Sequence, residues 1–65
     1  MDDFTYKIEN LEAGKPEYAI RYNDEEVYAK MKGDEEFLTS FDDNDTAYEV
    51  SLDGIRISKE EYENF

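Results

Sequence analysis

Carboxylates constrain this chain more than any other feature, because 19 of its 65 residues are Asp or Glu. They face seven Lys and Arg and no His, so the formal net charge is −12 at pH 7. Like charges in a small volume repel one another and oppose compaction. Any fold must therefore spread the acids over its surface, and we expect its stability to depend on salt.

The supply of core-forming side chains is small. Leu, Ile, Val and Phe total 13 of the 65 residues, a share at which a highly charged chain approaches disorder. Six Tyr residues compensate, because each ring buries a large apolar area. The chain contains no Cys, so disulfides cannot stabilise it. Its length allows one domain, and we predict a single folded domain over residues 1–65.

Alternation of apolar and polar residues predicts strands near both ends of the chain. Residues 4–8 and 18–22 each alternate with the period of a half-buried strand, and Gly14 before Pro16 indicates a loop between them. Residues 48–57 alternate on both sides of an Asp-Gly pair. Such a pair is a strong hairpin signal, because both residues tolerate positive φ.

The C-terminal segment carries a helix signal. Ser58 and Glu61 have the spacing of a capping box, in which each side chain bonds to the backbone N–H of the other residue. Tyr62 and Phe65 then share one helix face. We predict a short C-terminal helix.

The middle of the chain fits two structures. Asn23 and Glu26 have the spacing to cap a helix that ends at Gly33. The alternative is a hairpin that turns at Asn23-Asp24, which we favour because it places apolar and opposite-charge residues across from each other. Its register pairs Arg21 with Glu26, Ile20 with Val27 and Glu17 with Lys30.

Residues 37–41 fit either a short helix capped by Asp34 or another strand. In every version the fold class is α+β, a small single domain. Its antiparallel sheet is meander-like and carries the short C-terminal helix, and the additional helix in the middle is the open alternative.

The acids fall into four clusters. Residues 34–65 hold eleven acids and two bases, whereas residues 1–33 hold eight acids and five bases. In a meander, successive loops alternate between the two ends of the sheet. We therefore expect the turn near 24, the loop 42–45 and the C-terminal helix to lie at one end. The candidate partner-binding residues are Asp24, Glu25, Glu26, Asp34, Glu35, Glu36, Asp42, Asp43, Asp45, Glu60, Glu61 and Glu63.

This acid density is close to that of nucleic acid. A compact chain of this length spans about 28 Å, and the same length of duplex DNA carries roughly 16 charges. Alternate residues of a strand lie about 6.6–6.8 Å apart, similar to the spacing of phosphates along a backbone. The opposing interpretation is that each cluster is a solvated turn or helix N-terminus, where Asp and Glu are common.

Metal and catalytic sites have weak support. Asp42–Thr46 resembles the start of a calcium loop, but Ala47 stands where the loop needs Gly and Asp53 where it needs Glu. No His, Cys or glycine-rich phosphate loop is present. We therefore predict a protein that is not an enzyme and that has no metal and no cofactor.

In size, charge and acid clustering the whole chain resembles the small phage-encoded DNA mimics, particularly the anti-CRISPR proteins. The resemblance includes no shared motif, so no residue role is carried over from it. It implies a stoichiometric inhibitor that occupies the duplex or PAM-reading site of a CRISPR surveillance complex, where Arg and Lys hold DNA.

The partner is therefore expected to be a basic DNA-binding protein or complex, bound by a monomer of this chain. We expect no direct binding of nucleic acid or of membranes, because both carry negative charge. The sequence starts without a basic, apolar leader, and we expect a cytoplasmic protein, in the host bacterium if a phage encodes it. The alternative is an acidic adaptor that binds a basic protein surface without competing with DNA.

Overall fold

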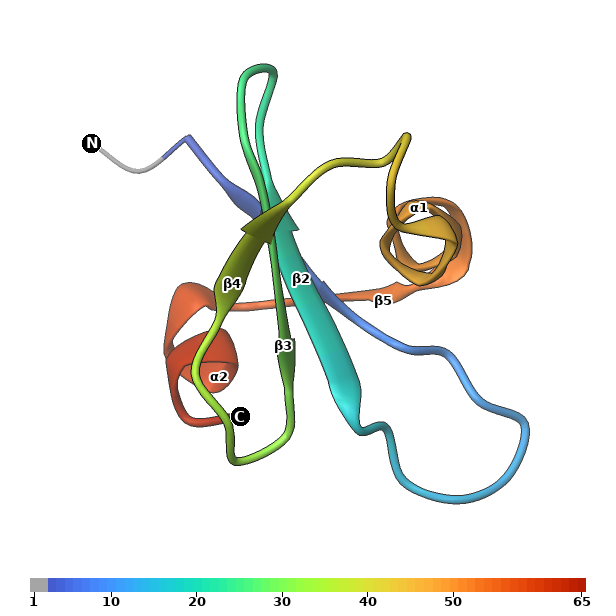
Figure 1. The fold of residues 1–65 in the computed structure, drawn as a ribbon. Coiled ribbons are helices and arrows are strands. Elements are labelled where there is room, and N and C mark those ends of the chain that lie inside the picture. The colour runs from blue at the N-terminus through green and yellow to red at the C-terminus, as the bar shows by residue number, and fades with distance from the viewer. Residues whose placement is uncertain (1–2) are drawn as a thin grey trace.

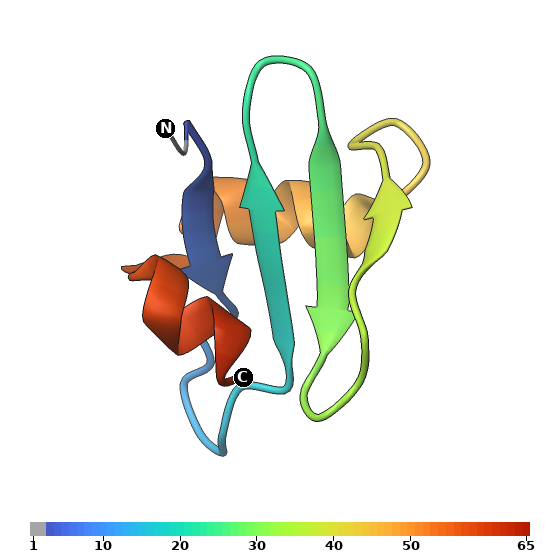
Figure 2. The same cartoon turned by 90° about the vertical axis from the view of Figure 1, so that its left-hand side faces the viewer.

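Residues 3–65 form a five-stranded antiparallel sheet with one helix on each face (Figures 1 and 2). This computed structural model describes those residues, so Met1 and Asp2 of the predicted 1–65 domain lie outside it. The predicted α+β class is confirmed. The elements are β1 (Thr5–Ile8), β2 (Tyr18–Tyr22), β3 (Val27–Met31), β4 (Phe37–Thr39), α1 (Asp45–Asp53), β5 (Ile55–Ile57) and α2 (Lys59–Glu63).

The first four strands form the predicted meander, and the fifth departs from it. The strand order is β4-β3-β2-β1-β5, so β5 pairs with β1 at the edge opposite β4. Between β4 and β5 the chain crosses one face of the sheet as α1, which lies behind the strands in Figure 2. This crossover decides where the acids near the C-terminus lie.

The predicted strands near the N-terminus are confirmed as β1 and β2. For residues 23–32 the hairpin interpretation is confirmed and the helix alternative is wrong, but the register differs by two residues. Arg21 pairs with Tyr28 rather than with Glu26, and Lys30 pairs with Ala19. A shift of two residues leaves each side chain on the expected face of the sheet.

The side chain of Asn23 explains the shifted register. Its Oδ1 accepts hydrogen bonds from the backbone N–H of Glu25 at 2.9 Å and of Glu26 at 2.7 Å. Asn23 is the first residue of this side-chain turn, so the turn centres on Asp24-Glu25 instead of Asn23-Asp24. The backbone N–H of Asn23 closes the turn by donating to the Glu26 carbonyl oxygen at 3.0 Å.

The predicted hairpin over residues 48–57 is wrong, because residues 45–53 form helix α1, but its second strand is confirmed as β5. Asn44 caps this helix by accepting a hydrogen bond from the backbone N–H of Ala47 at 3.0 Å. Ala47 and Val50, three residues apart, are both buried against the sheet. Burial at helical spacing therefore prevails over the alternation of Tyr48, Val50 and Leu52.

Gly54 ends the helix without forming the positive-φ turn that its Asp-Gly pair suggested. Its φ is −68°, and its backbone N–H donates to the Val50 carbonyl oxygen. A Cβ at this position would meet the Val50 carbonyl oxygen first and would lie 2.8 Å from the Ile8 carbonyl oxygen. Glycine is needed here because the last turn of α1 and strand β1 both approach this position closely.

The ambiguous residues 37–39 form strand β4 at the edge of the sheet, and the helix alternative there is wrong. The predicted C-terminal helix is confirmed as α2, with the capping box of Ser58 and Glu61 in place. Neither helix of residues 3–65 has the length and apolar character that crossing a membrane requires.

The helices define two separate cores. Ile20 and Ala29 meet Ala47 and Val50 under α1. On the other face Tyr62 of α2 packs with Tyr6 and Ala19, which belong to β1 and β2. Figure 2 shows that α2 lies in front of β1 and β2 and leaves β3 and β4 without a covering helix on that face.

Candidate partner-binding surface

Two of the four acidic clusters lie at the same end of the sheet. Asp24 and Glu25 are in the turn after β2, and Asp42 and Asp43 are in the loop after β4. Both strands are antiparallel to β3, which lies between them, so both end at the top of Figure 2. Asp45 begins α1 beside this loop. We call these five exposed residues the acidic end.

The other clusters lie elsewhere, so the expectation that the C-terminal helix shares this end is wrong. Asp34 and Glu35 are in the turn between β3 and β4, at the opposite end of the sheet. The backbone N–H of Gly33 in that turn donates to the Phe65 carbonyl oxygen at 3.0 Å, which places the end of α2 there as well. The acids of α2 are Glu60, Glu61 and Glu63.

The crossover explains this placement. Successive loops lie at alternating ends of the sheet only while each strand pairs with the strand that precedes it in the sequence. Here α1 returns the chain to the far side of β1, and α2 then folds back over the sheet.

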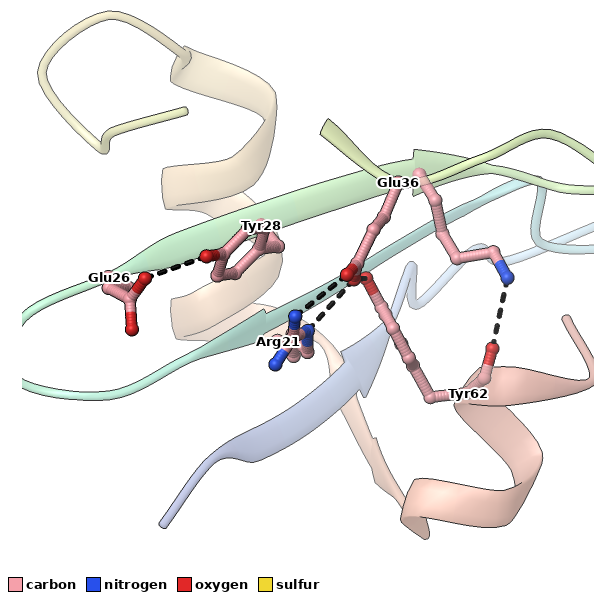
Figure 3. A network of polar contacts seen from close by, with 6 residues as sticks. Arg21, Glu26, Tyr28, Glu36 and Tyr62 are labelled. Carbon is pink, nitrogen blue, oxygen red and sulfur yellow. Dashed lines mark hydrogen bonds and ion pairs between the residues drawn. The ribbon is translucent and has the colours of Figure 1, made fainter. Parts of the chain in front are cut away.

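Glu36 and Glu26 are engaged within the molecule. Glu36 accepts hydrogen bonds from Arg21 at 2.8 and 2.7 Å and from the Tyr62 hydroxyl at 2.9 Å (Figure 3). Glu26 accepts one from the Tyr28 hydroxyl at 2.6 Å. These two carboxylates are therefore structural, although all twelve candidate residues are exposed to solvent.

The polar network of Figure 3 shifts the titration of its members. The hydrogen bond from Arg21 holds the pKa of Glu36 below its usual range, although partial burial opposes this. The same bond raises the pKa of Arg21. Burial, followed by the hydrogen bond to Glu36, raises the pKa of the Tyr62 hydroxyl. At neutral pH the network therefore holds a carboxylate, a guanidinium and a neutral phenol.

Three of the seven basic side chains are held against the sheet. Lys7 donates to the Ser51 carbonyl oxygen at 2.6 Å. The guanidinium of Arg21 lies 4.3 Å from the ring centroid of Phe4 and also binds Glu36. Lys30 is 9% exposed. The basic residues that remain exposed are Lys15, Lys32, Arg56 and Lys59, so the outer surface is dominated by carboxylates.

Helix α1 places two further acids, Glu49 and Asp53, in line with the candidate residue Asp45. Asp45, Glu49 and Asp53 are spaced by four residues and are exposed, so they form one stripe along the helix. Like charges at this spacing destabilise a helix by about 0.2–0.5 kcal/mol per pair. The spacing was visible in the sequence, but the strand assigned to these residues concealed its meaning.

Apolar side chains border this stripe. Tyr48 and Leu52, also four residues apart, are 48% and 62% exposed. An exposed ring and an exposed aliphatic side chain beside carboxylates are typical of a protein-binding surface, in which a few apolar anchors are surrounded by polar groups.

No group of three or more potential ligand side chains within residues 3–65 is arranged to hold a metal ion. The five acids of the acidic end therefore form a charged surface, spread over a turn, a loop and a helix terminus. Comparisons with family models, curated proteins and solved structures found no match for this chain.

Proposed function

We propose that the protein is an acidic DNA-mimic inhibitor of the anti-CRISPR or a similar anti-defence type. It binds the duplex or PAM-binding site of a CRISPR surveillance complex in the bacterial cytoplasm and has no catalytic activity. The observation that carries the proposal is the separation of charge: carboxylates face outward, while Lys7, Arg21 and Lys30 are held by internal partners.

The dimensions of the molecule support this proposal. Its principal extents are 32 × 25 × 19 Å. Duplex DNA about 32 Å long carries roughly 19 phosphate charges. The net charge of −12 is of the same order. A surface that holds phosphates with Arg and Lys would hold these carboxylates through similar charge-assisted hydrogen bonds.

The acidic end and the α1 stripe are the proposed contact surface. They share Asp45 and continue from the turn after β2 to the end of α1. Glu36 is excluded from this surface because it is bound to Arg21. Tyr48 and Leu52 would contribute apolar contact beside the charged groups.

The test is displacement of DNA from purified CRISPR surveillance complexes. A fluorescent duplex that contains the PAM is bound to each complex, and the acidic protein is titrated in. For the complex that is its target, we expect saturable loss of DNA binding near one protein per DNA site. If the protein binds a complex and leaves its duplex bound, the adaptor alternative replaces this proposal.

A pair of matched variants separates a placed surface from bulk charge. Asp24→Lys with Asp42→Lys changes two residues of the acidic end, and Glu12→Lys with Glu17→Lys changes two exposed acids outside it. Each pair raises the net charge from −12 to −8. We expect the first pair to weaken inhibition at least tenfold and the second pair to weaken it less than threefold. Equal losses would show that net charge alone inhibits.

A further inference from the structure

A cleft of about 730 Å³ lies on the face of the sheet that α2 covers only in part. Its basic lining is Arg21, Lys30 and Lys59, three of the seven basic residues of the chain. Such a concentration of cations is unexpected in a protein of net charge −12. Its volume falls in the range of roughly 300–1,000 Å³ that small-molecule sites occupy.

The carboxylates of the cleft do not cancel these cations equally. Glu36 binds Arg21 through two hydrogen bonds, so this pair is neutral as a unit. Lys30, Lys59 and Glu63 then leave one net positive charge among the lining residues. The lining therefore carries a small formal positive charge, unlike the protein as a whole.

Lys30 provides an anchor for an anion. It is 9% exposed, and its ammonium donates to the Tyr62 carbonyl oxygen at a long 3.3 Å. The ammonium also lies 5.3 Å from the centroid of the Tyr62 ring. An ammonium carries three donors, so an oxygen acceptor from a ligand would improve its hydrogen bonding. Burial strengthens such a bond, because water screens it less.

Aromatic rings form the apolar part of the lining. The ring centroids of Tyr6 and Tyr62 are 5.3 Å apart, and those of Phe4 and Tyr6 are 6.5 Å apart. Tyr6 and Tyr62 belong to the core and hold fixed positions, being 7% and 4% exposed. A planar apolar group can pack against such rings in offset or edge-to-face geometry.

We propose that this cleft binds a small aromatic monocarboxylate. Its ring would pack mainly against the half-buried Phe4, beside the small exposed parts of Tyr6 and Tyr62, and its carboxylate would accept hydrogen bonds from Lys30 with support from Lys59. The ligand carries a single charge, because the −12 of the whole protein opposes the approach of polyanions such as nucleotides. This site shares no residue with the acidic end, which follows the C-terminal ends of β2 and β4.

The test is a titration of the full chain with 2-naphthoate, followed by backbone amide NMR. A ligand of 13 non-hydrogen atoms with the efficiency usual for drug-sized ligands has a dissociation constant of about 1 mM. We expect saturable shifts at Arg21, Lys30 and Tyr62. Acetate tests the need for the ring, and 2-naphthalenemethanol tests the need for the charge. We expect both to bind at least fivefold more weakly.

Two charge-removing variants complete the test. Lys30→Met should weaken naphthoate binding about tenfold, whereas Lys15→Met, on an exposed loop residue outside the cleft, should leave it within twofold. If Lys30→Met does not fold, Lys59→Met on the rim replaces it, with an expected loss of at least threefold. Shifts outside the cleft, equal binding of the alcohol, or equal affinity of the cleft variant and Lys15→Met would each overturn the proposal.

Discussion

Glu36 accepts two hydrogen bonds from the guanidinium of Arg21, at 2.8 and 2.7 Å, and thereby ties the segment before β4 to β2. The Tyr62 hydroxyl donates to the same carboxylate and adds α2 to this link. One of the acids that the sequence presented as a partner-binding residue therefore holds three elements of the fold together.

Glu36→Gln should destabilise the protein by about 1 kcal/mol, because it removes the charge that Arg21 binds. The value is modest because the two side chains are 22% and 33% exposed, so solvent screens the pair. Urea unfolding measures the change. Glu35→Gln is the matched control, since it removes a neighbouring exposed charge, and it should change stability by less than about 0.5 kcal/mol. Equal effects would show that Glu36 acts only through net charge.

The contribution of Glu36 should depend on pH. Its pKa is lowered in the folded state by the hydrogen bond from Arg21, so the stabilisation is complete above the unfolded pKa of about 4.3. It is lost as the pH falls through the lower folded-state pKa. The difference in unfolding free energy between the native chain and Glu36→Gln should therefore shrink below about pH 4.3. A difference that stays constant from pH 7 to pH 2 would contradict this assignment.

Gly54→Ala should destabilise the protein by about 1–3 kcal/mol, the usual range for overpacking. The new Cβ would lie 2.8 Å from the Ile8 carbonyl oxygen, and backbone atoms cannot move aside as a flexible side chain can. Gly14→Ala is the comparison, because its cost comes from a φ of +88° with nothing within 4 Å of the added atom. Thermal unfolding measures both, and Gly54→Ala should lower the midpoint further than Gly14→Ala.

Local signals made half of this fold predictable from the sequence. The alternation in 4–8 and 18–22 and the capping box of Ser58 and Glu61 each act within a few residues, so they specify β1, β2 and α2 without tertiary information. The turn at Asn23 was also recognised, but its register depends on which backbone N–H groups the side chain binds.

Tertiary packing decided the rest. Residues 48–52 alternate like a strand, yet burial of Ala47 and Val50 against the sheet makes them helical. That helix creates the crossover to β5, and the crossover in turn separates the acids of α2 from the acidic end. The exposure of the acids could be predicted from their charge, but their grouping could not. The stripe that includes Glu49 required knowledge of the helix.

Stability should rise with salt. The carboxylates of the acidic end and of the α1 stripe repel one another at low ionic strength, and salt at 0.15 M screens exposed charges over about 8 Å. We expect the thermal midpoint to increase by several degrees between about 0.01 and 0.5 M NaCl. Asp45→Asn with Glu49→Gln should reduce this increase, because it removes neighbouring charges on one helix face. A midpoint that falls with salt would mean that attractive ion pairs dominate.

The order of addition tests the central claim most directly. A mimic of the incoming duplex should block a surveillance complex when it is added before target DNA, and should have little effect once the R-loop has formed. A molecule 32 Å long covers about 9 base pairs, enough for a PAM-proximal entry site but not for a complete guide–target duplex. Target binding by the purified complex is measured with the protein added first or last. We expect strong inhibition in the first case and nearly none in the second. Equal DNA binding in the two orders of addition, with the protein and the DNA bound to the complex together, would contradict the account.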